Sequence, residues 1–519
     1  MTHQGERGRL RHTSEIAVST EVTGTTAASG ENMARTPGER AMLVDGERPP
    51  ERDLRRRRRL VLAVCCTSVF IGNLNNTVLN VALPAMQRDL HGSLSGLQWT
   101  TDAYLIVLAA LLMLAGAAGD RLGRRRVFQT GLAVFTLSSI LCGLAPALGW
   151  LIFFRVFQAI GASMLNPVAM AIITNVFSEP RERVRAIGVW GTVLGIAMAA
   201  GPLVGGVLVQ AAGWRSIFWL NLPIGLAALV CAARFVPESR AATPRRMDPV
   251  GQLLVIVLMA TLTCAIIEGP AAGWGAPGVL GCVGAAGAAL IALIPYELRR
   301  SDPLIDLPVF RRAAFSGASA MAVCSFFVLG GFLFLNTLYL QDVRGLSALA
   351  AGAYLLPMAG MNVLTSPISG RLTAAYGPRL PLLLAGAATT GGGLLLAAGA
   401  ETRDALLFPA YCLIGIGVGL ANTPITNAAM AGMPREQAGV AAAVISTSRQ
   451  FGQALGVAVL GALLATGLHH GTYAGFVAAA RPAYWLVTAC GSAILALTLL
   501  TTTRSVERST ARRRRAGRP

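Results

Sequence analysis

Three charged side chains lie deep within long apolar stretches of this sequence: Asp102 in "WTTDAYLI", Arg155 in "FFRVFQ" and Arg449 in "TSRQFG". A charge at the centre of a bilayer costs about 2.5–3.5 kcal/mol on insertion scales, so each residue is a candidate for function. Arginine stays protonated in proteins, whereas a carboxyl group can release and rebind a proton. The pattern therefore indicates proton-coupled chemistry at Asp102, and a purely structural ion pair is the alternative.

Neutral amides form a second set of polar residues at membrane depth. The stretch "GNLNNTVLNVALP" at 72–84 contains four asparagines and no acid. Asn75 and Asn80 lie about 140° apart on a helix, and amides so deep must find hydrogen-bond partners inside the protein. We expect Asn75, Asn80, Gln158 and Arg449 to line a cavity for a small polar or zwitterionic organic molecule. For Arg449, structural pairing is the alternative.

Apolar windows of about 20 residues, the length of a membrane-spanning helix, recur along the chain. We place fourteen of them, at 60–82, 97–118, 127–145, 150–175, 184–209, 215–235, 250–268, 277–297, 313–340, 347–372, 380–400, 405–430, 438–466 and 484–503. The sequence therefore predicts an all-α integral membrane protein that contacts lipid along most of its length.

The arginines support this count. Clusters such as "RRRRR" at 55–59 and "GDRLGRRR" at 119–126 all fall in alternate connections, and the positive-inside rule assigns these to the cytoplasm. Both termini are then cytoplasmic. Residues 1–59 are predicted to be a disordered tail, with Met33 and Met42 as alternative starts, and 504–519 form a basic tail.

Composition excludes several functions. The 519 residues are 54% hydrophobic and 13% charged, with a net charge of +19 that comes from arginines set between apolar runs, so nucleic acid is not an expected partner. The chain has no lysine and hence no P-loop, so an ion gradient must supply any energy. No cysteine pair has metal-ligand spacing, and the adjacent His469 and His470 are not expected to bind metal. We expect no cofactor and no enzymatic activity.

An internal repeat suggests two halves. "GAAGDRLGRR" at 116–125 follows the second span, and "GRLTAAYGPR" at 370–379 follows the tenth; the two segments share Gly and Arg positions. This predicts a six-helix half at 60–235, an inserted helix pair at 236–300 and a second six-helix half at 301–503, which move relative to each other.

Five motifs in this order resemble the fourteen-helix drug:proton antiporter branch of the major facilitator superfamily, the EmrB/QacA-like group. They are "GAAGDRLGRRR", "RVFQAIGAS", "GTVLGIAMAAGPLVGG", "GWRSIFWLNLPIG" and "LNNTVLNVALP". The resemblance covers about 60–505. It implies an alternating-access fold of two six-helix halves with two additional helices.

The resemblance also implies roles for particular residues. Asp102 occupies a "WxxDxY" position that carries an acid in some members, and Arg155 would tune it as a fixed positive charge. Asp120 and Arg124 would form a charge lock, with simple membrane anchoring as the alternative. The gating loop then comprises Gly116, Asp120, Arg121, Gly123 and Arg124. The antiporter helix comprises Gly195, Gly201, Pro202, Gly205 and Gly206. For the antiporter helix, generic close packing is the alternative.

Two positions depart from the family pattern. Ala159 stands where the span-four motif has glycine, and Asn75 replaces the aspartate of the span-one motif. The expected function is proton-driven efflux of drug-like or natural-product compounds by a monomer in the plasma membrane. The missing acid keeps a uniporter or importer open as an alternative, and a non-transporting membrane sensor is another.

Overall fold

The computed structural model describes residues 51–241, 248–300, 307–399, 404–430, 438–467 and 473–516. These residues form helices and connecting turns, without strands. Among them, thirteen helical segments are long and apolar enough to cross a bilayer, and α16 (Ala438–Gly467), at the position of the expected thirteenth span, is a further helix of 30 residues. The predicted all-α membrane fold is therefore confirmed. Met33, Met42, His469 and His470 lie outside the described residues.

The helices from α2 to α8 are here called the first bundle. Their bounds are α2 (Glu51–Leu90), α3 (Leu94–Leu122), α4 (Arg124–Gly143), α5 (Leu148–Val176), α6 (Pro180–Ala212), α7 (Ser216–Trp219) and α8 (Asn221–Phe235). Local sequence sets the ends of α3: the Ser93 hydroxyl accepts a hydrogen bond from Gly96 N at 3.1 Å, and Gly123, with φ of +113°, ends the helix. The expected sixth span is divided into α7 and α8 at Leu220.

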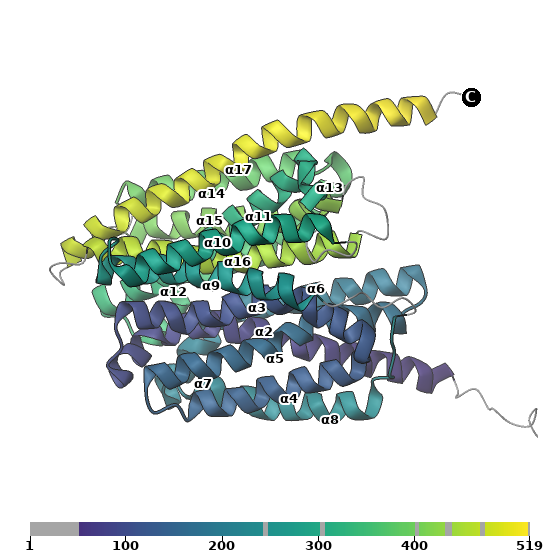
Figure 1. Ribbon diagram of the computed structural model, residues 1–519, viewed down its shortest axis with the longest axis horizontal. Coiled ribbons are helices and arrows are strands. Elements are labelled where there is room, and N and C mark those ends of the chain that lie inside the picture. The colour runs from purple at the N-terminus through teal and green to yellow at the C-terminus, as the bar shows by residue number, and fades with distance from the viewer. Residues whose placement is uncertain are drawn as a thin grey trace, which may run out of the picture. The chain divides into compact units, whose positions relative to one another are not determined.

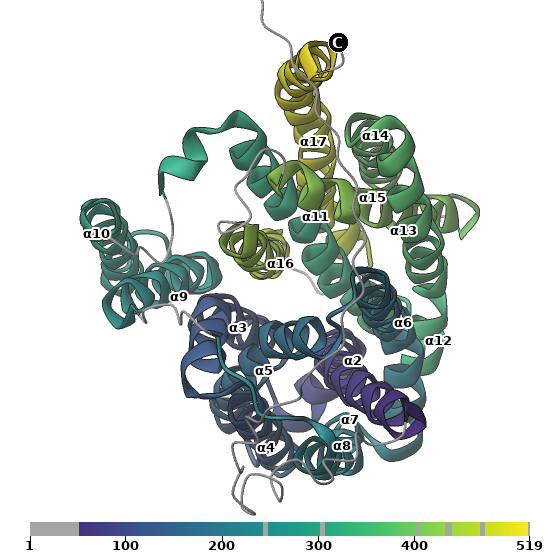
Figure 2. The ribbon, with the colours of Figure 1, turned by 90° about the vertical axis from the view of Figure 1, so that its right-hand side faces the viewer.

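The additional pair consists of α9 (Pro249–Ala272) and α10 (Pro277–Arg299). α9 packs against α3 of the first bundle and against α16, whereas α10 packs mainly against α9. In Figure 2, which looks along many of the helix axes, α9 lies beside α3 and α10 lies further out. The additional pair thus contacts the rest of the protein through one of its two helices.

The helices from α11 onward are here called the second bundle. They are η1 (Leu307–Arg311), α11 (Ala313–Leu338), η2 (Tyr339–Val343), α12 (Ala348–Tyr354), α13 (Leu356–Tyr376), α14 (Arg379–Ala397), α15 (Asp404–Met430), α16 and α17 (Tyr473–Ala516). η2 is a π-helical turn that extends α11, a form that is rare and often found at functional sites. Pro357 follows the break between α12 and α13 at Leu355, where a proline suits a helix start.

Both expected tails are shorter in the structure. α2 begins at Glu51, so residues 51–59 are helical, because arginine is a good helix former and no glycine or proline interrupts the run. Arg58 Nη1 donates to Glu182 Oε2 at 3.0 Å, which attaches this segment to α6. α17 likewise continues to Ala516, beyond the predicted membrane boundary at 503.

Among the described residues, the apolar cluster that joins the two bundles most extensively lies at one end. The connections after α3, α5, α8 and α10 carry most arginines and define what is here called the arginine-rich end; the other is the opposite end. At the opposite end one cluster joins the bundles, and it includes Leu79, Leu83, Met86, Phe332, Leu335, Leu340 and Leu460. Toward the arginine-rich end two further clusters lie mainly in one bundle each, around Phe128 and Ile172 and around Phe315 and Ile425. Ala454 of α16 belongs to the first of these clusters, and Met113 of α3 packs against the second. The bundles are therefore closed together at the opposite end (Figure 1).

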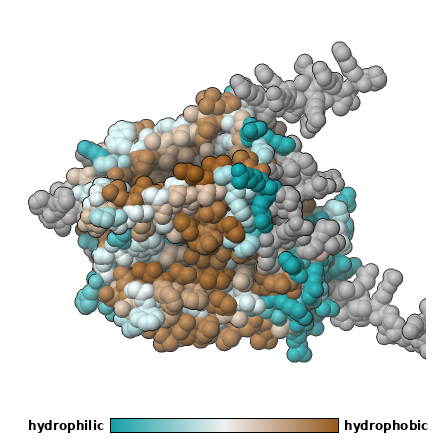
Figure 3. Space-filling view, in the orientation of Figure 1, coloured by the Kyte–Doolittle hydropathy of each residue, from teal (hydrophilic) through white to brown (hydrophobic). Residues whose placement is uncertain are grey.

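The outer surface matches a lipid environment. Figure 3 shows hydrophobic residues along the sides of the helices and hydrophilic residues gathered near the arginine-rich end. On α10, the side chains of Leu280, Val283 and Ile291 are 56%, 52% and 74% exposed. Such exposure is costly in water but suits contact with acyl chains.

Candidate functional site

Arg155 is fully buried on α5 and is held by neutral groups. Its Nε donates to Thr100 O at 3.1 Å, and its Nη1 donates to Gln158 Oε1 at 2.7 Å. Its guanidinium carbon lies 4.0 Å from the centroid of the Tyr104 ring, a cation–π distance. The charge of Arg155 is thus stabilised by α3 and by its own helix, without a carboxylate partner among the described residues.

Asn75 belongs to the network that continues from Arg155. Gln158 Nε2 donates to Ser139 Oγ at 2.7 Å and to Asn75 Oδ1 at 3.4 Å, and Asn221 Nδ2 donates to Asn75 Oδ1 at 3.3 Å. These residues come from α2, α4, α5 and α8 and are all buried. The amide that replaces the family's aspartate therefore accepts from Gln158 and Asn221, and its Nδ2 donates to Gln158 Oε1 at 3.5 Å, in a network that is bonded to Arg155.

Asp102 is fully buried on α3, and neither of its carboxylate oxygens has a hydrogen-bond partner among the described residues. Asp102 lies four residues after Gln98, and the Gln98 Nε2 donates to Ala458 O of α16 at 2.9 Å. It lies three residues after Trp99, and the Trp99 Nε1 donates to Glu268 Oε1 of α9 at 2.8 Å. Residues three and four apart share a helix face. Asp102 therefore faces α16 and α9, and the structure does not pair it with Arg155.

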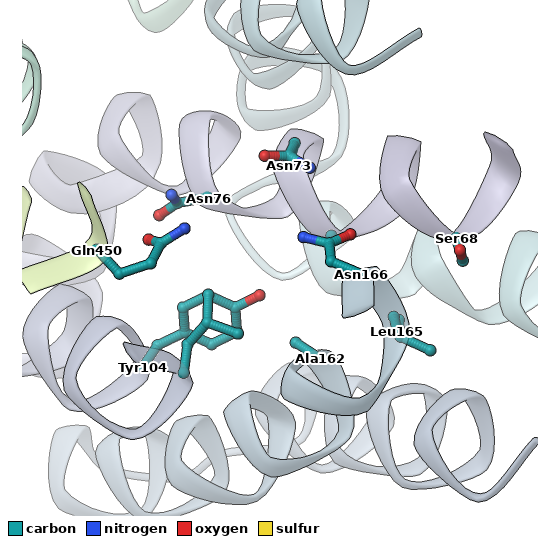
Figure 4. A pocket seen from close by; sticks show the side chains of 10 residues that line it. Ser68, Asn73, Asn76, Tyr104, Ala162, Leu165, Asn166 and Gln450 are labelled. Carbon is teal, nitrogen blue, oxygen red and sulfur yellow. The ribbon is translucent and has the colours of Figure 1, made fainter. Parts of the chain in front are cut away.

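A pocket lies between α2, α3, α5 and α16 (Figure 4). It is lined by Ser68, Gly72, Asn73, Asn76, Tyr104, Leu108, Ala162, Leu165, Asn166 and Gln450. In Figure 4 the polar ends of Asn76, Tyr104, Asn166 and Gln450 lie around one space. The oxygens Asn76 Oδ1, Asn166 Oδ1 and Gln450 Oε1 form no hydrogen bond with the described residues.

The four residues that the sequence predicts for a cavity are not among those that line this pocket. Asn75 and Gln158 lie in the buried network, and Asn80 Nδ2 donates to Asn76 O of its own helix at 3.1 Å. Arg449 Nη2 donates to Thr426 Oγ1 at 2.6 Å and to Asn422 O at 3.0 Å, both on α15. The sequence neighbours Asn76 and Gln450 line the pocket instead.

The loop between α3 and α4 brings together the residues predicted for gating. Arg124 Nη2 lies 2.9 Å from Asp120 Oδ1, and both side chains are partly buried. Gly123, which lies between these two residues in the sequence, is buried, whereas Arg121 is exposed. Gly116, further back on α3, faces Pro167 of α5. The Asp120–Arg124 pair thus joins two helices of the first bundle and does not cross to the second.

The segment after α8 is attached to this loop, a feature that sequence reasoning missed. Glu238 Oε1 accepts from Arg125 N at 3.1 Å, and Ser239 O accepts from Arg124 N at 2.9 Å. Ala241 N donates to Asp120 O at 3.1 Å. The connection that leads to the additional pair therefore holds the gating loop through main-chain bonds.

The glycines of α6 form two different contacts. Gly201 and Gly205 pack against Thr77 and Val78 of α2, within the first bundle, where a Cβ at Gly205 would lie 3.0 Å from Val78 O. A Cβ at Gly195, in contrast, would meet open space. The predicted antiporter helix is thus tightly packed only from Gly201 onward.

Gly206 packs across the boundary between the bundles. A Cβ there would lie 2.7 Å from Ala348 O and 2.8 Å from Leu349 Cα, both on α12. Gly352 faces α6 from the other side, where a Cβ would overlap Pro202 O. This contact is here called the α6–α12 seam; Gly352 was not predicted from the sequence.

Polar contacts also cross between the bundles at the opposite end. Gln341 Nε2 of η2 donates to Val81 O of α2 at 2.8 Å, and Arg88 lies 3.6 Å from Asp342. Further in, Asn76 Nδ2 donates to Gln453 Oε1 of α16 at 3.4 Å. Together with the shared core, these contacts describe one conformation of a two-bundle protein, closed at the opposite end.

Comparison with known proteins gives a consistent result. The family described as the Major Facilitator Superfamily matches residues 65–457. The multidrug resistance protein Stp of Mycobacterium tuberculosis is 38% identical over 410 residues, 79% of this chain and 76% of that protein. The tetracenomycin C resistance and export protein of Streptomyces glaucescens is 36% identical, over 80% of this chain and 78% of the relative. The puromycin resistance protein of Streptomyces alboniger is 36% identical, over 85% of this chain and 89% of that relative.

Solved structures agree at the level of fold. A bacterial homolog of the human lysosomal transporter Spinster, in an inward-facing and unoccupied conformation, aligns with a TM-score of 0.61 at 18% identity, over 89% of this chain and 99% of that one. A POT family transporter in complex with a thioalcohol-conjugated peptide gives 0.62 at 17% identity, over 86% and 96%.

Proposed function

The chain belongs to the major facilitator superfamily, and from this premise we propose that it is a proton-driven antiporter that exports drug-like or natural-product compounds from the cytoplasm. Relatives named for multidrug resistance and for resistance to and export of tetracenomycin C, each more than 30% identical over most of the chain, support the direction and the substrate type. Its arginine clusters support a plasma-membrane protein with both termini and the arginine-rich end in the cytoplasm. It acts as a monomer.

The observation that carries the proton coupling is the position of Asp102. Its carboxyl group is fully buried against α9 and α16 and has no hydrogen-bond partner among the described residues. Burying an ionised carboxylate without a partner is far more costly than burying the neutral acid. The conformation closed at the opposite end therefore favours protonated Asp102.

This preference links the proton to the movement of the bundles. α16 belongs to the second bundle, so separation of the bundles at the opposite end hydrates Asp102 and removes the cost of its charge. Protonation from outside then favours closure and returns the protein to the inward-facing conformation. For net proton import, Asp102 releases this proton to the cytoplasm in that conformation when the compound binds, and the loaded, deprotonated protein opens outward again. Tyr104, two residues along α3, lines the pocket and stacks on Arg155, so α3 connects ligand and proton.

The test is transport by purified protein in proteoliposomes with an imposed pH gradient, with radiolabelled tetracenomycin C as the probe. We expect accumulation driven by the gradient, and a loss of at least tenfold in Asp102→Asn, while exchange of labelled for unlabelled compound without a gradient persists. Glu182→Gln, which alters a partly exposed acid on α6, is the control and should behave as wild type.

Two results would contradict the proposal. Gradient-driven accumulation that survives in Asp102→Asn would make this carboxylate structural. Equilibration of the compound in wild type regardless of the gradient would identify a uniporter.

A further inference from the structure

The pocket between α2, α3, α5 and α16 contains hydrogen-bonding groups but no charged group. Its polar lining comes from Ser68, Asn73, Asn76, Tyr104, Asn166 and Gln450, and its apolar lining from Leu108, Ala162 and Leu165. Each carboxamide offers one acceptor oxygen and two N–H donors. Its free volume is about 10 Å³, so in this conformation the pocket receives a single hydroxyl or amide group of a larger molecule.

Three of these amides have unused hydrogen-bonding capacity. The oxygens Asn76 Oδ1, Asn166 Oδ1 and Gln450 Oε1 are buried without a partner among the described residues. A buried acceptor without a partner costs free energy, which a ligand that donates hydrogen bonds recovers. In Figure 4 Asn76 and Gln450 lie on one side of the pocket and Asn166 lies on the other, and the amide nitrogens of Gln450 and Asn166 are turned toward the space between them.

The charges around the pocket have one sign. Arg155 stacks on Tyr104, with its guanidinium carbon 4.0 Å from the ring centroid, and Arg449 directly precedes Gln450 on α16. Arg155 has no acidic partner among the described residues, and Arg449 is bonded to neutral groups of α15. The Arg449 side chain is turned toward α15, so the charge that adjoins the pocket is that of Arg155, behind the Tyr104 ring.

Acidic side chains are absent from the pocket lining. Asp102 lies on the face of α3 that meets α9 and α16 and is absent from the pocket lining. Position 75, where the family has an acid, holds an amide. A cationic group in this pocket therefore has the positive charge of Arg155 behind Tyr104 and meets no negative charge in the lining.

We propose that this pocket receives an uncharged hydroxyl or amide group of the exported organic molecule, and that it excludes a cationic group at the same place. This rests on the proposed function in that the pocket is taken as the site of the exported compound. The selectivity follows from the neutral amide lining and from the fixed positive charge of Arg155 behind it.

The test compares two forms of one scaffold that differ in charge. At pH 6.5 the α-amine of puromycin is protonated, whereas in N-acetylpuromycin it is an uncharged amide. Binding to the full-length protein in lipid nanodiscs is measured for both compounds. We expect N-acetylpuromycin to bind at least tenfold more tightly, and Gln450→Leu to weaken its binding at least tenfold.

A charge variant makes the test independent of folding defects. Gln450→Glu keeps the side-chain size and adds a negative charge at the pocket, so we expect the preference to shift at least tenfold toward puromycin. Gln210→Glu, the same change at an exposed position of α6, is the control and should leave the preference unchanged. Size exclusion and thermal unfolding verify that each variant is folded.

The proposal is overturned if puromycin binds as tightly as its acetylated form, if neither form binds, or if Gln450→Glu leaves the preference unchanged. Flux measured separately in proteoliposomes distinguishes failure of the function from failure of the selectivity. A retained binding preference without gradient-driven flux contradicts only the antiporter function. Gradient-driven flux of puromycin in preference to the acetylated compound contradicts only the selectivity.

Discussion

Replacing Gly206 by alanine should open the protein at the end opposite the arginine clusters. Gly206 of α6 packs on the backbone of α12 across the boundary between the bundles. A Cβ at this position would lie 2.7 Å from Ala348 O and 2.8 Å from Leu349 Cα, whereas ordinary contacts begin at 3.4 Å. The two helices must therefore separate by roughly 0.7 Å, because backbone atoms cannot rotate away as a side chain can.

The size of the effect follows from the cost of overpacking. An extra methyl group in a well-packed interface costs about 1–3 kcal/mol. The clash exists only while α6 and α12 are in contact, so its cost falls on the closed conformation. The ratio of open to closed molecules should then rise about 5–150-fold.

The assay is the distance distribution between two spin labels across the opposite end. Leu144 of the first bundle is 60% exposed, and Ala405 of the second bundle is also exposed. Labels attached through unnatural amino acids at these positions leave the nine native cysteines unchanged. We expect Gly206→Ala to add or enlarge a long-distance population.

Gly195→Ala is the matched control, because it adds a methyl group to the same helix where no atom lies within 4 Å. Both variants gain similar helix propensity, which is about 1 kcal/mol for alanine over glycine. Identical distance distributions in the two variants would refute the reasoning. A lower thermal stability of Gly206→Ala with an unchanged distribution would show that the cost falls on folding and not on the conformational equilibrium.

Three other substitutions test separate parts of the protein. Asp120→Asn should lower the maximal transport rate about 3–10-fold while changing the free energy of unfolding by no more than about 1 kcal/mol. The control is Arg126→Gln, at a more exposed position of the same loop. Equal transport rates in the two variants would contradict a gating role. Asn75→Asp introduces a titratable group into the buried network, so the pH profile of transport should change; an unaltered profile would show that this position is isolated from coupling. Trp99→Phe removes a 2.8 Å hydrogen bond to a carboxylate of α9 and should cost about 0.5–1.5 kcal/mol of stability in thermal unfolding. The control is Trp274→Phe, at a residue that is 57% exposed, and it should cost less. A larger loss in the control would show that the hydrogen bond of Trp99 does not stabilise the protein.

The helices were predictable because membrane-spanning segments obey a simple physical rule. Each must satisfy its own backbone and present apolar side chains over about 20 residues, so windows of composition locate them. Where the chain leaves the membrane this rule no longer applies. The helical start of α2 at Glu51 and the continuation of α17 to Ala516 were therefore missed.

Which residue of a polar pair meets the pocket was not predictable. Asn75 and Asn76, like Arg449 and Gln450, are adjacent and so point about 100° apart on their helices. The rotation of each helix depends on packing against others, which composition does not encode. For the same reason the sequence identified Asp102 and Arg155 as buried charges but gave no indication that Asp102 faces α9 and α16.

The position of the additional pair affects how a compound dissolved in the acyl chains approaches the pocket. α9 contacts both α3 and α16 and so covers one flank, where the two bundles meet. On the other flank α6 meets α12 and α13 with no further helix outside them in the described ranges. The two flanks therefore present different surfaces to molecules that partition into lipid, with α9 over one and the α6–α12 seam directly exposed at the other. The additional helix pair thus makes the two sides of this protein unequal within the plane of the membrane, an asymmetry that two six-helix bundles alone would lack.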